Sequence, residues 1–113
     1  MITVTVFHPE KEYARTEVIV FSAEVDEGNA DSDLHANLSP AAGLVEAHIE
    51  DIDGIISIDA DDETGDLAVA YDPWAAPWRD WYGNVVYAIK QFYEAAYDRK
   101  IPVTEKIEPS SHL

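Results

Sequence analysis

The residues of this sequence that could do chemistry are mainly carboxylates, and they gather in DADDETGD at 59–66. Clustered carboxylates suit calcium, which prefers oxygen ligands. An EF-hand loop, however, needs glycine at its sixth position and glutamate at its twelfth. Counted from Asp59, Gly65 falls at the seventh position and Ala70 stands at the twelfth. We therefore expect a solvated turn with at most loose cation binding, and no resident metal or other cofactor.

Other reactive side chains are few. The chain has no cysteine, which excludes thiol nucleophiles, thiolate metal sites and disulfides. The histidines at positions 8, 35, 48 and 112 are scattered, and His35 beside Asp31 and Asp33 is only a weak metal signal. The nucleophile-elbow, phosphate-loop and zinc-protease motifs are absent. The sequence therefore predicts no catalytic residue and no enzymatic activity.

Charge is the dominant feature of the composition. The 113 residues include 23 acidic and 7 basic side chains, which give a net charge of −16. Residues 16–78 hold 16 of the acidic side chains and no lysine or arginine, whereas the rest of the chain holds seven of each sign. A field of this sign repels nucleic acid and anionic membranes and attracts basic surfaces. The whole imbalance lies in the middle of the chain.

Two explanations compete for this acidity. In the first, the carboxylates imitate nucleic-acid phosphates and bind the basic surface of a DNA- or RNA-handling protein, as a viral anti-defence inhibitor would. Asp59 and Asp61 would stand about 7 Å apart on one strand face, a spacing comparable to that of backbone phosphates. In the second, the chain is a ferredoxin-like adaptor or oligomer subunit of a halophile, acidic through adaptation to salt. Concentration of the excess in one segment favours the first explanation.

The predicted partner-binding surface combines a hairpin, a helix edge and one tryptophan. Trp74, between Pro73 and Pro77, is expected to be exposed, whereas Trp78 and Trp81 belong to an apolar helical stripe. An aromatic platform for single-stranded nucleic acid needs a positive groove, which this acidic segment lacks. The predicted contact residues are Asp59, Asp61, Asp62, Glu63, Asp66, Asp72, Glu46, Glu50, Asp53 and Trp74.

The strands that must position these residues follow from hydrophobic periodicity. Apolar or alternating runs predict strands at 2–7, 16–23 and 100–108, of which 16–23 is expected to be central. Residues 54–73 are typical of a hairpin with Gly65 in its turn. Its apolar face is expected to hold Ile56, Ile58, Leu67, Val69 and Tyr71.

Two helices are predicted between and after these strands. Ser39 as N-cap and Pro40 after it indicate a helix start, and an apolar stripe then continues to Ile52. A stronger stripe of about 22 residues begins at Trp78. The remaining segments are an acidic loop at 24–38 and a C-terminal tail at 109–113.

The element order predicts a single α+β domain at 1–108, with a ferredoxin-like β-α-β-β-α-β arrangement and an extra N-terminal strand. We expect a mainly antiparallel sheet with both helices on one face. The stretch VEAHIEDIDGIISIDADDETGDLAVAYDP resembles in rhythm the middle of heavy-metal-associated domains and, more loosely, the N-terminal domain of Nfu-type iron–sulfur scaffolds. The metal-binding Cys-x-x-Cys of the first family is absent, so the resemblance implies the fold and no metal handling.

The location and contacts of the protein follow from the same features. No apolar run reaches membrane-spanning length, and no signal peptide is visible, so we expect a cytoplasmic location, in the host cytoplasm for a viral protein. We expect no direct contact with nucleic acid or membrane, and self-association stays open.

Overall fold

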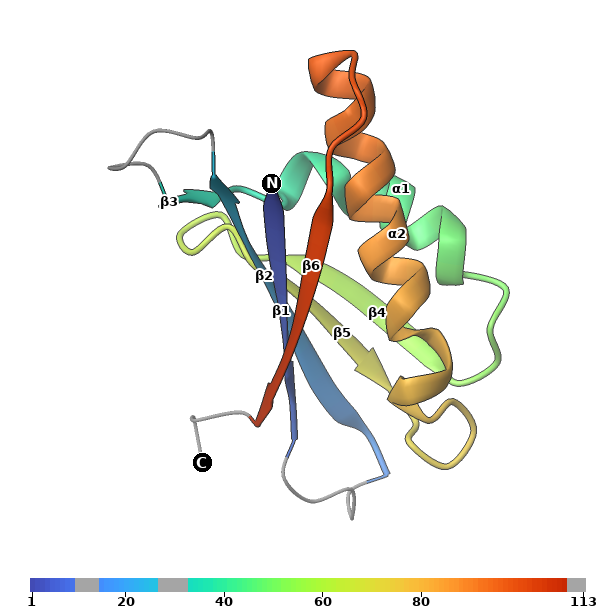
Figure 1. The fold of residues 1–113 in the computed structure, drawn as a ribbon. Helices are drawn as coiled ribbons and strands as arrows, with labels where there is room; N and C mark the ends of the chain where they lie inside the picture. Colours follow the sequence, from blue (N-terminus) through green and yellow to red (C-terminus); the bar gives the residue numbers. More distant parts are fainter. Residues whose placement is uncertain (10–14, 27–32, 110–113) are drawn as a thin grey trace.

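The computed structural model describes residues 1–9, 15–26 and 33–109. Its elements are β1 (Ile2–His8), β2 (Glu17–Asp26), β3 (Asp33–Ala36), a 3-10 turn (Ser39–Ala41), α1 (Ala42–Ile49), β4 (Ile55–Ala60), β5 (Leu67–Tyr71), α2 (Trp78–Tyr97) and β6 (Val103–Pro109). The strands form one sheet in the order β4-β5-β2-β1-β6, with β3 paired to β2. Both helices lie on the same face of that sheet (Figure 1). The described residues thus form a single α+β domain, as predicted.

Strand pairing differs from the prediction. Four pairings are antiparallel, but β1 and β6 pair in parallel, so the sheet is mixed. The N-terminal strand is the cause, because β1 lies between β2 and β6. A β-α-β-β-α-β unit alone would place β6 directly beside β2, antiparallel to it. Since β1 already runs antiparallel to β2, β6 meets β1 in parallel, and the predicted ferredoxin-like arrangement is not reproduced.

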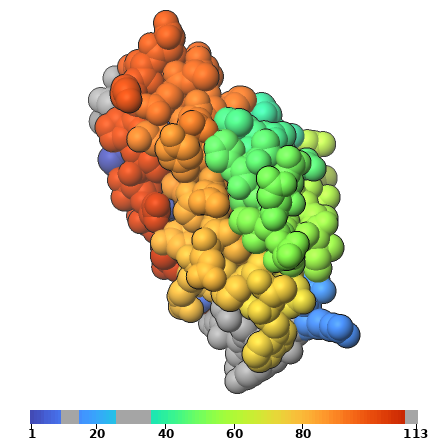
Figure 2. All heavy atoms as spheres, turned by 90° about the vertical axis from the view of Figure 1, so that its right-hand side faces the viewer, coloured from blue at the N-terminus to red at the C-terminus, as the bar shows by residue number. Residues whose placement is uncertain are grey.

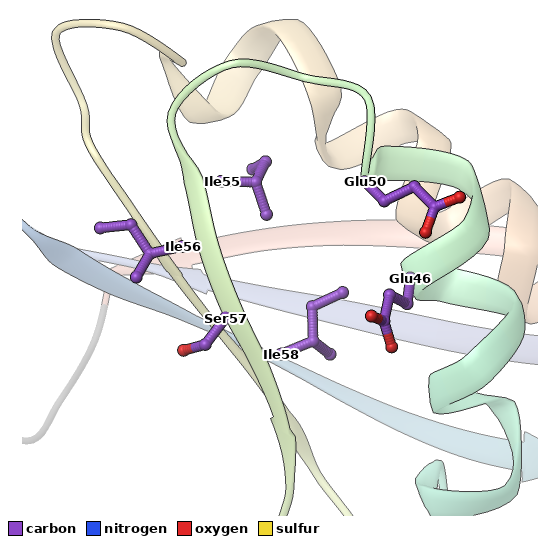
Figure 3. Close-up of a pocket in the computed structure, with 6 residues that line it drawn as sticks. All are labelled: Glu46, Glu50, Ile55, Ile56, Ser57 and Ile58. Atoms are coloured by element: carbon purple, nitrogen blue, oxygen red, sulfur yellow. The ribbon is translucent and has the colours of Figure 1, made fainter.

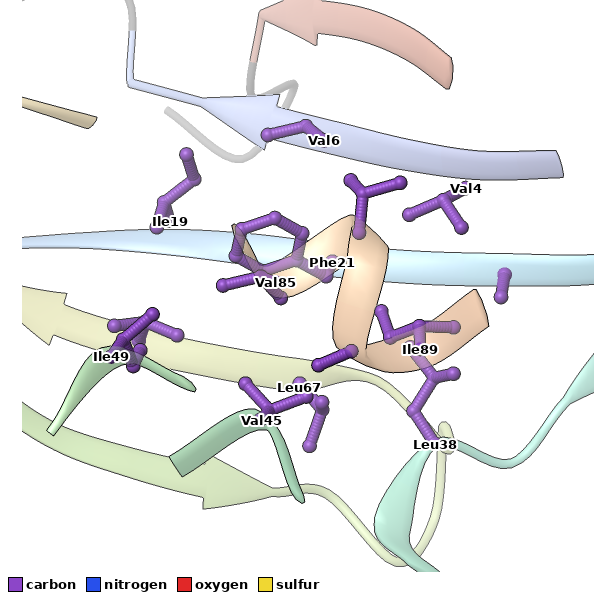
Figure 4. Close-up of a cluster of buried hydrophobic side chains, with 14 of the residues drawn as sticks. Val4, Val6, Ile19, Phe21, Leu38, Val45, Ile49, Leu67, Val85 and Ile89 are labelled. Atoms are coloured by element: carbon purple, nitrogen blue, oxygen red, sulfur yellow. The ribbon is translucent and has the colours of Figure 1, made fainter. Parts of the chain in front are cut away.

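The core lies between the sheet and the helices. On the central strands, every second residue is buried, as expected when one strand face packs on a helix layer. Figure 4 shows Val4 and Val6 of β1, with Ile19 and Phe21 of β2, gathered around Val85 of α2. All five side chains are fully buried, which confirms β2 as a central strand and the predicted stripe of α2.

The helix layer covers one side of the molecule. α1 and α2 pack against each other on this face of the sheet, and Figure 2 shows them side by side in green and orange. The other sheet face bears no helix among the described elements, and Val18 on it is 51% exposed. None of the described helices is long and apolar enough to cross a membrane.

The three tryptophans divide as predicted. Trp78 and Trp81 are each 1% exposed, and the indole N–H of Trp81 donates to the carbonyl oxygen of Ala76 at 2.8 Å. The imidazole of His8 stacks on Trp78 with ring centroids 4.9 Å apart. Trp74 is 75% exposed. Two tryptophans therefore build the core, and the third lies at the surface.

A bulge in β4 overturns the prediction for one isoleucine. Ile55 pairs with Tyr71 and Ser57 pairs with Ala70, so Ile56 is the extra residue between them. The alternation of the strand shifts at this point, and Ile56 is 57% exposed instead of buried. Ile55, and not Ile56, lies on the helix side of the sheet at this point of β4.

The predicted loop at 24–38 is partly strand. β2 continues to Asp26, and β3 pairs with the last residues of β2. Residues 27–32 of that loop and residues 110–113 of the predicted tail lie outside the described part of the chain.

The start of the first helix also differs from the prediction. Ser39 does not act as the N-cap: it begins the 3-10 turn, and its amide N–H donates to the side-chain oxygen of Asn37 at 3.0 Å. Its hydroxyl donates to the Asp62 carboxylate at 3.5 Å. Ser39 therefore ties the helix start to the hairpin.

Candidate functional site

The acidic segment of the sequence and the charge-balanced segment that follows it form opposite edges of the sheet. β4, β5 and α1 come from the acidic segment 16–78 and lie together at one side of the sheet. β6 forms the opposite edge of the sheet and carries Lys106. Arg79 and Lys90 are on α2. We call the side formed by β4, β5 and α1 the acidic edge.

A groove runs along the acidic edge between α1 and β4. Its volume is about 370 Å³, and it is lined by Glu46, Glu50, Ile55, Ile56, Ser57 and Ile58. Figure 3 shows both glutamates on the α1 side of the groove, with the Glu46 carboxylate directed towards Ile58 and the Glu50 carboxylate directed away from β4. One helical turn separates the glutamates, so their Cβ atoms are about 5–6 Å apart. The groove thus has an acidic wall from α1 and a mainly apolar wall from β4.

β4 is an outermost strand of the sheet. Within the described chain it pairs only with β5, so its outer side presents alternate backbone N–H and C=O groups that no strand satisfies. Its sequence IISIDA contains neither lysine nor proline, residues that often protect sheet edges from further pairing. The opposite edge, β6, contains both Lys106 and Pro109. β4 lacks both of these residue types, and its own edge features are the bulge at Ile56 and the charged Asp59.

The start of β4 is held in place by the turn at 72–77. The amide N–H of Asp72 donates to the carbonyl oxygen of Gly54 at 2.7 Å. The Asp72 carboxylate accepts hydrogen bonds from the amides of Trp74, at 2.9 Å, and Ala75, at 3.3 Å. Exposed Trp74 thus belongs to a turn that packs on the residue before β4.

At the hairpin tip, the Asp61 carboxylate accepts hydrogen bonds from backbone amides of the turn. Asp61 lies just beyond β4, and its carboxylate accepts from the amides of Glu63, at 2.9 Å, and Thr64, at 3.3 Å. These backbone hydrogen bonds, first the one from Glu63, lower the pKa of the Asp61 carboxyl below its ordinary value, because they stabilise the charged form. Gly65 has φ +78°, in agreement with its predicted place in the turn.

The predicted hairpin residues do not form one row of carboxylates. Asp59 and Asp61 are not two steps along one strand, because β4 ends at Ala60. Asp66 is half-buried beside the same tip, whereas Asp72 follows the far end of β5. Asp59, Asp61 and Asp66 therefore lie near the tip of the hairpin, whereas Asp72 lies at its other end.

The helix residues of the predicted surface separate as well. Glu46 and Glu50 reach the groove, but Asp53 lies exposed in the turn after α1. Glu46 and Glu50 belong to the predicted helix edge, and the sequence pattern did not indicate that they would lie beside β4.

His48 and His8 each donate a hydrogen bond to a backbone carbonyl oxygen. Nδ1 of His48 donates to the carbonyl oxygen of Leu44 at 2.9 Å, and Nδ1 of His8 donates to that of Pro9 at 2.9 Å. Asp31 and His112 lie outside the described residues. Within the described ranges, no group of three or more histidine, aspartate or glutamate side chains could hold a metal ion.

Comparison with known proteins gives a faint likeness in structure alone. No family model and no curated protein matches the sequence. Two solved structures are similar, both of the essential ribosomal processing protease Prp from S. aureus, one in complex with a covalently linked product peptide and one with a substrate peptide. They are 21% and 20% identical in sequence, with TM-scores of 0.40 and 0.39. Each match covers 94% of this chain and 100% of the other.

These matches correct the functional prediction. The neighbours are a protease, not a nucleic-acid mimic or a viral inhibitor, and they contradict both the predicted mimicry and the predicted absence of enzymatic activity. In the hairpin, Asp61 and Asp72 also accept backbone hydrogen bonds within their own turns. With TM-scores near 0.4, the likeness assigns no protease activity to this chain. The predicted binding of a nucleic-acid-binding protein stays a prediction.

Proposed function

We propose that this domain binds an extended polypeptide segment, which pairs with the outer side of β4 and lies in the groove beneath α1. The single observation that carries the proposal is the unpaired outer side of β4 next to a groove of about 370 Å³. An exposed sheet edge adds a peptide strand through main-chain hydrogen bonds, and neighbouring pockets then select alternate side chains.

The composition of β4 supports this function. Three of its six residues are isoleucine, and Ile56 is 57% exposed at the bulge. An exposed apolar strand edge without lysine or proline is a site where another chain pairs readily. Exposed Trp74, in the turn that packs on Gly54, is a further proposed contact at the start of β4, since tryptophan often anchors interfaces.

A second copy of this chain would be a poorer partner than a foreign strand. β6 is the other outermost strand, and its register with β1 places Val103, Glu105 and Ile107 on the helix side of the sheet. Paired with β4 of a neighbour, β6 would bring Glu105 close to Glu46 and Glu50. Like charges in such positions repel, which disfavours pairing between copies.

The Prp structures each contain a peptide. That observation belongs to Prp, and at such TM-scores it carries no argument for this chain. The proposal stands on the groove and the strand edge alone.

The proposal is tested with capped peptides of about nine residues, within the length range of natural strands. Three peptides alternate threonine with lysine, glutamine or glutamate, and each has a twin in which every backbone amide is N-methylated. We expect at least one unmethylated peptide to bind, to change the amide resonances of residues 55–60 and to slow their hydrogen exchange. Its N-methylated twin has the same side chains but cannot pair, so it should not bind.

Residues 103–109 serve as the internal control, because β6 is the other edge of the same sheet. Resonance changes at β6 without changes at β4 would refute the proposal. So would the failure of all three peptides at about 1 mM, or equal binding of methylated and unmethylated twins.

A further inference from the structure

The two glutamates of the groove indicate the chemistry of the strand that it binds. We propose that this strand presents two basic side chains, lysine or arginine, at alternate positions, one facing Glu46 and the other facing Glu50. The inference rests on the function proposed above and adds the side-chain selectivity of the same site.

Alternate side chains of a strand and side chains one helical turn apart have similar spacings. On an extended strand, residues i and i+2 point to the same face and lie about 6.4–6.8 Å apart. Glu46 and Glu50 are one helical turn apart, and their Cβ atoms are separated by about 5–6 Å. Figure 3 shows that the line from Glu50 to Glu46 follows the direction of β4 from Ile55 to Ile58. A strand paired with β4 would therefore bring two alternate side chains past the two carboxylates.

Among the described residues, no lysine or arginine lines the groove. None of the six lining residues is basic, and residues 16–78 contain no lysine or arginine. Glu46 and Glu50 are both exposed, so their carboxylates are hydrated in the free protein at little cost. Asp51 and Asp59, which directly follow the lining residues Glu50 and Ile58 in the sequence, add to the negative field. A ligand is thus the natural source of positive charge at this site.

The form of a basic side chain also suits this groove. Lysine and arginine can lay their aliphatic stems along apolar surface while the charged head stays in water. Ile55 and Ile58 supply that apolar surface, and Glu46 and Glu50 line the α1 side of the same groove, Glu46 with its carboxylate towards Ile58. A shorter side chain, or a neutral polar one, could not both pack on the isoleucines of β4 and pair with a glutamate of α1.

The test compares the lysine, glutamine and glutamate peptides on the wild-type protein and on the double variant Glu46→Gln/Glu50→Gln. We expect the lysine peptide to bind the wild type roughly 3- to 30-fold more tightly than the glutamine peptide, the range of two partly exposed ion pairs. The double variant should lose that preference and still bind the glutamine peptide. The preference should also shrink as salt is raised, because the pairs are screened.

The matched control is Glu63→Gln/Glu108→Gln, which removes the same charge from exposed positions at the hairpin tip and on β6. This control should keep the lysine preference. If the control lost it equally, the net charge of the protein would be the cause, and the inference would be wrong. If the wild type bound lysine and glutamine peptides equally through β4, the inference would fail while the proposed function stood. If no peptide bound through β4, the function itself would fail.

Discussion

Gly54 packs directly against Ala76: a Cβ placed on Gly54 would stand 2.8 Å from the Cβ of Ala76 and 2.9 Å from that of Ala75. Gly54 also has φ +105°, a backbone conformation that other residues rarely adopt. This contact joins the turn at 72–77 to the start of β4. The position of the groove therefore depends on a glycine.

We predict that Gly54→Ala destabilises the protein by about 1–3 kcal/mol, because both the space and the backbone conformation oppose a Cβ. Urea unfolding followed by circular dichroism measures the change. Gly43→Ala is the matched control, since nothing lies within 4 Å of a Cβ at Gly43. In that exposed helical position, alanine should be neutral or stabilising by up to about 1 kcal/mol. Equal effects of the two changes would contradict the close contact.

A charge in the core between α2 and the sheet should abolish folding. Ile89 is fully buried, and Ile89→Asp would leave an unpaired carboxylate in an apolar surrounding, a change of more than about 4 kcal/mol. We expect the variant to lose its cooperative unfolding transition. Ile56→Asp makes the same replacement at a side chain that is 57% exposed and should change stability by less than about 1 kcal/mol. A folded Ile89→Asp variant would mean that α2 does not pack on the sheet.

The turn at the hairpin tip should depend on pH through Asp61. Its pKa is lowered in the folded state, so its contribution to stability is present above the pKa of the unfolded chain, about 4, and is lost as pH falls through the lower folded value. Asp61→Asn removes this titration. The difference in unfolding midpoint between wild type and variant should therefore be largest near pH 7 and vanish in strong acid.

Glu63→Gln at the same tip is the control, because it removes an equal charge and leaves its own backbone N–H in place as a donor to Asp61. We expect Glu63→Gln to change the unfolding midpoint at pH 7 less than Asp61→Asn does, because it leaves both hydrogen bonds to the Asp61 carboxylate in place. A pH-independent effect of Asp61→Asn would show that the charge of this carboxyl does not stabilise the turn.

Trp74→Ala should separate binding from stability. The side chain is 75% exposed, so we expect a change in unfolding free energy of less than about 1 kcal/mol. Binding of the tightest peptide should weaken if Trp74 contacts the bound strand at the start of β4. Fluorescence-monitored unfolding remains possible, since Trp78 and Trp81 stay in the core. A large loss of stability would instead make Trp74 a packing residue.

Much of the fold was predictable because the apolar residues that recur with the period of a helix or strand are the ones that are buried. The apolar stripe that begins at Trp78 repeats with the helical period, and α2 is observed from Trp78 to Tyr97. The apolar run in β2 predicted a central strand, which the pairings with β1 and β5 confirm. The exposure of Trp74 followed from its place between two prolines, outside the stripe.

Other features depended on contacts between distant parts of the chain. β1 lies between β2 and β6. Which strands become neighbours in a sheet depends on long-range contacts, and no local sequence pattern determines it. The bulge at Ile56 shifts the alternation of β4 by one residue, which the sequence pattern of alternating side chains concealed. The carboxylate of Asp61 is used by the turn, although its spacing from Asp59 suggested a shared strand face.

The candidate site shows the same division between local and distant causes. The sequence by itself determined that residues 16–78 carry the whole charge excess, that Glu46 and Glu50 share one side of a helix, and that IISIDA forms a strand. Only the tertiary structure decided that this strand is an outermost one and that both glutamates line a groove beside it. The physical reason is that helix and strand formation follow local backbone and side-chain preferences, whereas the place of a strand in a sheet follows from how the whole core packs.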